Sequence, residues 1–319
     1  MILGLGIVHL SLLMLLGLVL DGLFGEVRRA HPLVGFGRYA SWIEARLNRA
    51  PARLLRGLFS WMLAVVPPMA LAAALLYGAG KSRPLLALAL HAVLLYFCLG
   101  LRSLRDHCLP IAVALRRGDL PGARSLTQRI VSRDTAQASA QDLSKAAVES
   151  LLENGNDAVF GTLFWFLIGG GTGALLFRLA NTLDAMWGYR NARFLFFGRV
   201  AARVDDALNW VPARLTAFTY LLLGNSRTAW RCWRAQAPAW SSPNAGPVMA
   251  SGAGALQLAL GGAATYEGMV EIRPPLGSGN PANCDDIERA WRLVSRGAAL
   301  WCCVTLLAAL IACALEYHA

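Results

Sequence analysis

The chain has 319 residues, of which 56% are hydrophobic and only 15% are charged, and its formal net charge is +11. Soluble domains have about 25% charged residues, so this composition excludes a protein that is surrounded only by water. The arginines flank long apolar stretches and form no single basic stripe with interleaved aromatic residues, which argues against a nucleic-acid partner.

Four apolar stretches are long enough to cross a hydrocarbon core about 30 Å thick, which takes about 20 helical residues. The first could be mistaken for a secretion signal. However, no basic segment precedes it, and Asp21-Gly22 stands where a cleavage site would need small residues, so we expect a retained helix. The four predicted spans are residues 2–20, 58–77, 85–101 and 298–315.

Arginines are concentrated in the loop after the first span and in the segment after the third. The link between the second and third spans holds only Lys81 and Arg83. The positive-inside rule therefore places both Arg-rich segments in the cytoplasm and the N-terminus outside.

The segment from residue 21 to 56 opens with Asp-Gly and His31-Pro32. It continues as an amphipathic pattern around Trp42, Ile43 and Leu47, with arginines on the opposite face. Such a helix is expected to lie along the membrane surface.

A polar, helix-forming segment follows from residue 110 to 156, with a turn predicted at Arg133-Asp134-Thr135 before a new helix. Residues 159–180 are apolar again, but the run Gly169 to Gly173 interrupts them, which favours a re-entrant or broken hairpin. The alternative is a complete crossing, which would place the polar runs on either side of it on opposite faces of the membrane.

The expected fold is an all-α integral membrane protein with about four to six membrane segments and a polar helical cytoplasmic region. We expect one polytopic domain over residues 1–319. Residues 1–101 hold three spans with the amphipathic loop, residues 102–297 the catalytic region, and residues 298–319 the last span. The seven cysteines include no CxxC pair, so neither a disulfide framework nor a zinc site is expected.

Acidic residues at a spacing of four mark the predicted helix that ends near residue 157. Glu149, Glu153 and Asp157 share one helical face, where like charges repel unless something neutralises them. Mg²⁺ is a natural candidate, because it prefers oxygen ligands and bridges carboxylates to phosphates. The alternative is a solvated face, or pairing with Arg133 and Lys145.

Two further polar strings lie close to apolar segments, where buried carboxylates and amides are costly and mark functional sites by default. Asn181-Thr182-Leu183-Asp184 follows one such segment, and Asp205-Asp206 with Asn209 precedes another. Asn181 and Asp205 could instead be helix caps, a common use of these residue types.

Several polar strings follow one another along the chain. They are Ser132-Arg133-Asp134-Thr135, Ala147-Val148-Glu149-Ser150 with Glu153-Asn154, Asn181-Thr182-Leu183-Asp184-Ala185-Met186-Trp187-Gly188-Tyr189, Arg203-Val204-Asp205-Asp206, Asn209-Trp210-Val211-Pro212-Ala213-Arg214 and Ser242-Pro243-Asn244-Ala245-Gly246. In this order they resemble the CobD/CbiB family of cobalamin biosynthesis, and the resemblance extends from Asp21 to the last helix. Ser132 stands where Gly is usual in the family, which is a mild departure.

The resemblance implies adenosylcobinamide-phosphate synthase activity, an ATP-dependent carbon–nitrogen ligation. Adenosylcobyric acid would be joined to (R)-1-aminopropan-2-ol or its O-phosphate, with ATP and Mg²⁺ as cofactors. It also implies a multi-pass protein of the bacterial inner membrane, in contact with lipid, whose active site faces the cytoplasm. Docking of other cobalamin-pathway enzymes and a homo-oligomer both stay open.

The activity suggests roles for the matched residues. Acidic side chains would hold Mg²⁺, arginines would clamp phosphates through bidentate contacts, and Asp205 or Asp206 could take the amine proton. The metal set is Glu149, Glu153, Asp157 and Asp184. The catalytic set is Arg133, Asp134, Arg203, Asp205, Asp206 and Arg214. The substrate-binding set is Asn154, Asn181, Thr182, Tyr189, Asn209, Ser242 and Asn244.

Two other classes of protein compete with the enzyme. A transporter would also place polar groups at broken apolar segments, but it predicts an internal repeat, and none is visible. The second is an AmpE-like membrane sensor without catalysis. The strings from Asn181 to Asp184 and from Ser242 to Gly246 favour the biosynthetic branch.

Overall fold

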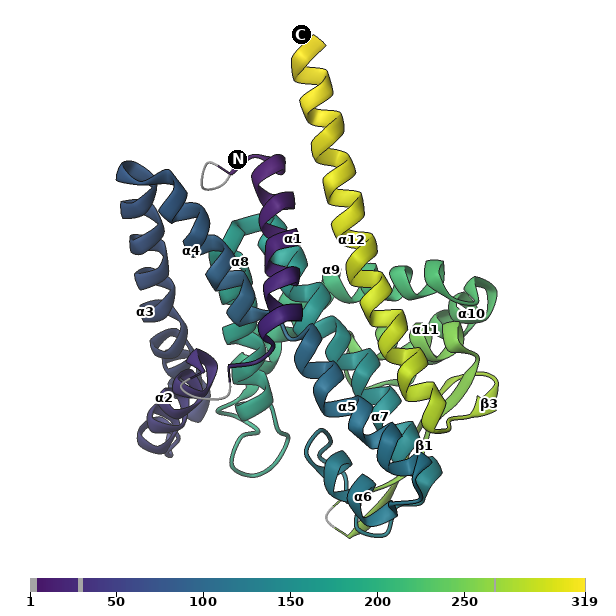
Figure 1. The fold of residues 1–319 in the computed structure, drawn as a ribbon. Coiled ribbons are helices and arrows are strands. Elements are labelled where there is room, and N and C mark those ends of the chain that lie inside the picture. Colours follow the sequence, from purple (N-terminus) through teal and green to yellow (C-terminus); the bar gives the residue numbers. More distant parts are fainter. Residues whose placement is uncertain (1–4, 28–30, 267, 319) are drawn as a thin grey trace. The chain divides into compact units, whose positions relative to one another are not determined.

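The computed structural model of the protein describes residues 5–27, 31–266 and 268–318, and most of them are helical (Figure 1). The elements are α1 (Ile7–Phe24), α2 (Pro32–Leu47), α3 (Arg53–Ser82), α4 (Pro84–Cys98), α5 (Leu101–Arg116), α6 (Leu120–Gln128), α7 (Ala140–Gly155), a π-helical turn (Asn156–Phe160), α8 (Gly161–Trp187), α9 (Arg199–Leu223), α10 (Ser226–Gln236), a 3-10 turn (Ala237–Ala239), α11 (Ala245–Leu256), β1 (Leu258–Tyr266), β2 (Met269–Gly277), β3 (Asn280–Pro281) and α12 (Cys284–His318).

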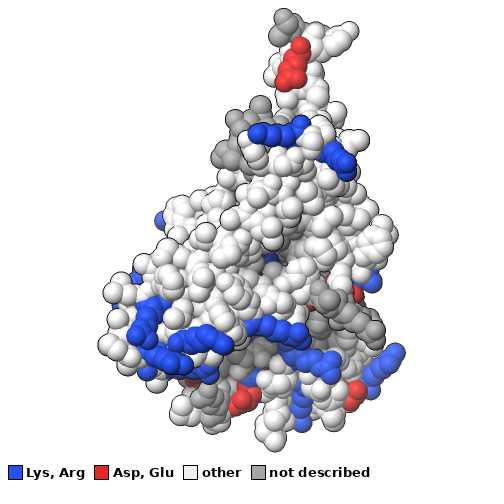
Figure 2. Space-filling view, turned by 90° about the vertical axis from the view of Figure 1, so that its left-hand side faces the viewer, with Lys and Arg blue, Asp and Glu red and all other residues white. Residues whose placement is uncertain are grey.

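Five helical stretches are long and apolar enough to cross a membrane, which confirms the predicted helical membrane fold. The longest run without a charged residue in the fourth stretch extends from Ala158 to Phe177. Helix α7 therefore lies outside the apolar part of that stretch. Figure 2 shows a broad uncharged area bordered by Lys and Arg side chains. The five stretches are Ile7–Phe24, Arg53–Ser82, Pro84–Arg116, Ala140–Trp187 and Cys284–Tyr317.

The chain divides into two compact units, and neither is continuous in sequence. Unit 1 contains Met1–Gly100, Gly161–Asn209 and Cys302–Ala319, and unit 2 contains Leu101–Phe160 and Trp210–Trp301. Most of the apolar spans therefore belong to unit 1, while α5 to α7, α10, α11 and the three strands belong to unit 2.

In unit 1, α2 packs through one apolar face into a core that includes Phe36, Ile43, Trp187 and Phe197. The amphipathic character predicted for this segment is present, but the predicted arrangement of its faces is wrong in one respect. Trp42 is 49% exposed, and the Arg46 guanidinium lies 4.0 Å from its ring centroid. The arginine therefore stacks on Trp42, which contradicts its predicted position on the opposite face.

The glycine run of α8 forms the predicted break. Gly169 and Gly170 have non-helical backbone angles, and the Gly171 N–H donates to His91 Nδ1 at 2.9 Å. A Cβ atom on Gly161 would collide with the ring of Phe177. In a straight helix these two residues would lie about 24 Å apart, so the chain must turn back and form a helical hairpin.

We expect Gly170→Ala to destabilise the protein by about 1–3 kcal/mol. Gly170 has a φ of 58°, which disfavours a side chain, and an added Cβ would approach His91 to 2.8 Å. Gly169→Ala is the matched control, because φ is −129° there and nothing lies within 4 Å of the added atom. Thermal unfolding in detergent measures both variants, and equal melting temperatures would contradict this account of the turn.

Unit 2 contains a small sheet that the all-helical prediction missed. Strands β1 and β2 form an antiparallel hairpin, and β3 pairs in parallel with only Leu258 and Ala259 of β1. Two further carbonyl groups of β1 accept hydrogen bonds from outside the sheet. Lys145 Nζ donates to Ala263 O at 3.4 Å, and the Asp134 N–H donates to Thr265 O at 2.8 Å. These bonds attach the hairpin to α7 and to the turn before it.

Candidate active site

A polar cavity of about 280 Å³ lies within unit 2. Its walls come from the segment before α7, from α7 itself, from the turn that leads into α11, and from the β1–β2 hairpin. The lining residues are Ile130, Val131, Ser132, Arg133, Ala146, Glu149, Ser150, Glu153, Asn154, Trp240, Ser241, Ser242, Ala245, Met249, Tyr266 and Arg273.

The centre of the cavity wall is a buried carboxylate held by two arginines. Arg273 donates from Nη1 to Glu149 Oε2 at 2.8 Å and from Nη2 to Oε1 at 3.2 Å, while Arg133 Nη2 donates to Oε2. The Gly261 N–H donates to Oε1 at 2.8 Å. Burial alone would raise the pKa of Glu149, but the two guanidinium groups outweigh it and lower that pKa. Glu149 is therefore a fixed anion that positions two cations at the cavity.

Glu153 lies one turn after Glu149 on α7 and is in the opposite electrostatic state. Burial, together with the negative charges of Asp157 and Glu149, raises its pKa to about 7 against the lowering effect of Arg133 and Arg273. Across residues 5–27, 31–266 and 268–318, no hydrogen bond or ion pair to Glu153 is formed. A carboxyl group in this state can exchange a proton near neutral pH or accept a metal ion.

The local fold of α7 fixes the spacing of these carboxylates. Ser139 and Asp142 form a capping box that starts the helix, which then runs without interruption to Gly155. The π-helical turn that follows contains Asp157, whose Oδ1 accepts a hydrogen bond from Asn156 Nδ2 at 2.9 Å. Asp157 stays near enough to raise the pKa of Glu153, as the spacing of four predicted.

The string from Ser242 to Gly246 forms the opposite wall. Ser242 Oγ accepts the N–H groups of Asn244 at 3.3 Å and Ala245 at 3.1 Å, so it stabilises the turn that begins α11. Arg214 holds the same turn from α9, with Nη1 donating to Asn244 Oδ1 at 2.8 Å and Nη2 to Pro243 O at 2.9 Å. Arg214 and Asn244 thus support the wall and do not line the cavity.

Among the residues predicted from the sequence, five are brought together at this cavity: Arg133, Glu149, Glu153, Asn154 and Ser242. Asp134 lies beside them but faces the hairpin, where its Oδ2 accepts the Gly268 N–H at 2.8 Å. Arg133 also lines a neighbouring cavity of about 640 Å³, which is bounded by the start of α7 and by β1. Arg133 is therefore accessible from two cavities of the same unit.

The remaining predicted residues lie in unit 1, where some of them form a polar group of their own. Asp205 accepts hydrogen bonds from Asn181 Nδ2 at 3.3 Å and Asn209 Nδ2 at 3.1 Å. Asn181 and Asp205 lie inside α8 and α9, so neither is a helix cap. The other residues of this set in unit 1 are Thr182, Asp184, Tyr189, Arg203 and Asp206.

Two residues of the unit 1 set differ in their environment. Burial raises the pKa of Asp206, against the opposing effect of Arg203 and Arg190. Thr182 Oγ1 donates to Arg178 O at 2.8 Å within α8. The roles predicted for these residues stay predictions.

The described residues contain no preformed group of three or more His, Cys, Asp or Glu side chains that could hold a metal ion. Asp184 belongs to unit 1 and the other three predicted ligands to unit 2, where Glu149 is already bound by two arginines. Burial and then the negative charges of Asp157 and Glu149 raise the pKa of Glu153, and a cation beside Glu153 would offset these charges. Mg²⁺ also often takes only one or two protein carboxylates, with substrate phosphates as further ligands.

Among the lining residues that sequence reasoning missed are Arg273, Trp240 and Tyr266. Arg273 lies 5.8 Å from the Trp240 ring centroid, and the Trp240 indole N–H is buried without a hydrogen-bond partner in the described part of the chain. Nothing in the local sequence marks Arg273, because it reaches Glu149 only through the pairing of β1 with β2.

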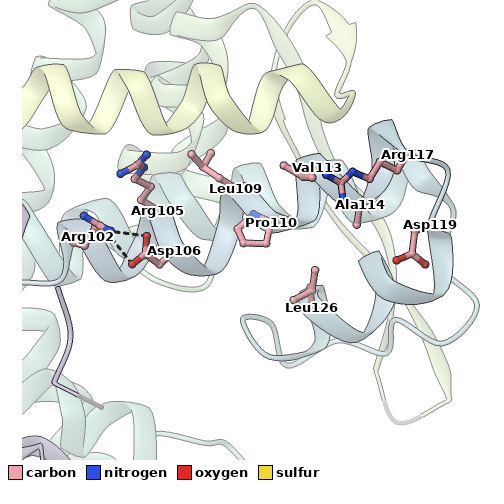
Figure 3. A pocket seen from close by; sticks show the side chains of 10 residues that line it. All are labelled: Arg102, Arg105, Asp106, Leu109, Pro110, Val113, Ala114, Arg117, Asp119 and Leu126. Carbon is pink, nitrogen blue, oxygen red and sulfur yellow. Dashed lines mark hydrogen bonds and ion pairs between the residues drawn. The ribbon is translucent and has the colours of Figure 1, made fainter.

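A second candidate site in unit 2 is a more open and more apolar cavity of about 570 Å³ along α5 and α6 (Figure 3). Arg102 pairs with Asp106 at 2.9 Å, and Arg105 lies 5.5 Å from the Trp291 ring centroid. The described residues that line this second cavity include no buried carboxylate bound by two arginines. It therefore lacks the fixed charges that make the first cavity the better candidate for an active site.

The chain is similar over most of its length to known proteins of one family. The family model described as CobD/Cbib protein matches residues 14–294. A cobalamin biosynthesis protein CobD from Stutzerimonas stutzeri is 55% identical over 293 residues, which cover 91% of this chain and 94% of that protein. The protein of the same name from Chromobacterium violaceum is 51% identical over 308 residues, covering 94% and 97%. No solved structure matches the chain.

Proposed function

The chain belongs to the CobD/CbiB family of cobalamin biosynthesis, and we propose that it is the ligase that makes adenosylcobinamide or its phosphate. It would join the carboxylate of adenosylcobyric acid to the amine of (R)-1-aminopropan-2-ol or its O-phosphate, with hydrolysis of ATP. The family implies corrinoid-type substrates and a membrane context. The specific reaction is our inference.

The observation that carries the proposal is the buried arginine pair of unit 2. A carboxylate does not react with an amine until it is activated, here as an acyl phosphate, and phosphoryl transfer depends on positioning and charge neutralisation. Arg133 and Arg273 supply two guanidinium groups fixed on Glu149 at a polar cavity. Fixed cations of this kind bind phosphate oxygens without having to reorganise first.

Glu153, with Asp157 near it, would hold Mg²⁺ in this site. When bound, the metal would neutralise phosphate charge, and the protein residues would contribute its position. Glu153 must be deprotonated to bind the cation, so its raised pKa makes metal binding sensitive to pH around neutrality. The proton acceptor roles of Asp205 and Asp206 stay predictions.

The shared position of Arg133 suggests how two substrates could meet. The smaller cavity suits phosphate groups, and the adjoining cavity of about 640 Å³ offers Lys145 and the backbone of β1 to a larger, amide-bearing molecule. Arg133 contributes to both walls. The cavity with the triphosphate and the cavity with the acid would then adjoin at Arg133 and Ala146, which line both.

We also propose that the protein lies in the bacterial inner membrane with unit 2 in the cytoplasm. The support is the distribution of arginines, which are concentrated after the first and third predicted spans. A site for a membrane-impermeant labelling reagent, placed in the segment from residue 117 to 119, should react only when the reagent has access to the cytoplasmic face of the membrane.

The test of function is ATP hydrolysis by the purified chain in nanodiscs, followed together with amide formation by mass spectrometry. We expect hydrolysis that depends on both the corrinoid acid and the amine, with one amide formed per ATP consumed. A transporter or a sensor should give no amide product. Hydrolysis that ignores the corrinoid would contradict the proposal.

A further inference from the structure

Unit 2 exposes an apolar stripe along α9, from Trp210 onward. Val211, Leu215, Phe218 and Leu222 follow each other at spacings of four, three and four residues, so they share one face of the helix. Phe218 is 49% and Leu222 is 56% exposed, and Trp210, which precedes the stripe in the sequence, is 55% exposed. The opposite face, with Ala213, Ala217 and Tyr220, is fully buried.

The next helix, α10, also exposes aromatic and basic side chains. Trp230 is 48% exposed and lies edge to face with Trp233, at a centroid distance of 5.6 Å. The Arg234 guanidinium lies 5.5 Å from the Trp230 ring centroid. Arg227, Arg231 and Arg234 are all exposed, whereas Ala229 and Cys232 are buried on the other side of the helix.

The charge of this region has one sign only. Between Ala207 and Tyr266 the sequence contains no aspartate or glutamate, and its charged residues are Arg214, Arg227, Arg231 and Arg234. An apolar face bordered by tryptophan and arginine is the composition of helices that lie in the interface between water and lipid. Tryptophan prefers that depth, and arginine there meets anionic headgroups.

We propose that this α9–α10 surface, made by Val211, Leu215, Phe218, Leu222 and Trp230 with the arginines of α10, lies on the membrane and binds anionic lipid headgroups. The apolar stripe would enter the boundary between headgroups and acyl chains. The alternative of a second copy docked by the same surface would place arginine against arginine with no acid to compensate. The membrane-spanning helices of the chain anchor it to the bilayer, so lipid is always available as a partner. This inference does not depend on the proposed reaction.

The test uses the full chain in nanodiscs, with a photoreactive benzophenone amino acid in place of Phe218 or Trp230. The matched control carries the same group in place of Ile272, which is 76% exposed on β2 of the same unit and has no such arginine cluster. After illumination, mass spectrometry identifies what each position has captured. We expect lipid adducts at Phe218 and Trp230 at least five times as abundant as at Ile272.

Lipid charge provides a second measurement. The nanodiscs for this measurement contain phosphatidylcholine with 30% phosphatidylglycerol. Among the lipid adducts at Trp230, the ratio of phosphatidylglycerol to phosphatidylcholine should be at least three times the ratio in the disc. Combining Arg227→Gln, Arg231→Gln and Arg234→Gln should remove the enrichment and leave lipid capture at Phe218 intact. The proposal is overturned if Phe218 and Trp230 capture a second copy of the chain, or capture no more lipid than Ile272.

Discussion

Glu149→Gln is expected to lower amide formation about 10²–10³-fold, and to lower the free energy of unfolding by about 3–5 kcal/mol, because it leaves two guanidinium groups buried without a counter-charge. The Glu149 side chain is only 3% exposed and accepts bonds from Arg133, Arg273 and the Gly261 N–H. Arg133 Nη2 and Arg273 Nη1 both donate to Oε2. A glutamine that keeps its oxygen there turns its N–H₂ group against Arg273 Nη2 and the Gly261 N–H, and the flipped amide turns that group against both arginines. The two arginines would then separate, and the site would lose its fixed cations.

The measurement is turnover in nanodiscs together with thermal unfolding in detergent. Glu288→Gln is the matched control. It makes the same chemical change in unit 2 on a carboxylate that also contacts two arginines, Arg116 at 2.6 Å and Arg292 at 3.4 Å. That group is partly exposed, so its loss should cost below about 1 kcal/mol and leave turnover near normal. Similar behaviour of the two variants would refute the role assigned to burial.

Glu153→Gln is expected to reduce turnover about 10²-fold and to remove a pH dependence that the wild type shows. The Glu153 carboxyl has its pKa raised to about 7, so it is largely protonated at pH 6 and largely ionised at pH 8. If the ionised form binds Mg²⁺, metal affinity rises as the pH rises through 7. Glutamine cannot ionise, so the variant should bind Mg²⁺ weakly at every pH.

A readout without substrates separates this role from a purely structural one. A carboxyl whose pKa is raised on folding contributes stability at low pH that is lost as the pH rises through about 7, because the buried group must then ionise. The wild type should therefore melt at a lower temperature at pH 8 than at pH 6. Mg²⁺ should raise the melting temperature at pH 8 and so remove this difference. Glu153→Gln should melt equally at both values and ignore Mg²⁺. A variant that still responds to Mg²⁺ would rule out Glu153 as its ligand.

The sequence was most informative where a feature depends on neighbours along the chain. The turn at Arg133-Asp134-Thr135, the helix that carries Glu149 and Glu153, and the break at Gly169 are all local, and the structure contains each of them. Each rests on helical spacing or on glycine conformation, which a single segment determines.

The features that could not be predicted from the sequence depend on pairing between distant segments. Strand β1 is rich in small residues and glycine and directly follows α11, so its pattern does not differ from that of a continued apolar helix or loop. Only its ladder with β2 brings Arg273 to Glu149, across 124 positions of sequence. Likewise, the ordered strings gave no indication that some of their residues lie in unit 1 and others in unit 2.

The division of the chain also bears on how the protein is made. The boundaries between the units fall after Gly100, Phe160, Asn209 and Trp301, and two of them lie inside α9 and α12. Each unit therefore needs segments that are far apart in the order of synthesis, and α12, which is made after the other described helices, contributes to both. The growing chain therefore cannot complete either unit before α12 has been made. Truncation before residue 284 should leave neither unit closed, and the shortened chain is expected to be degraded in the cell.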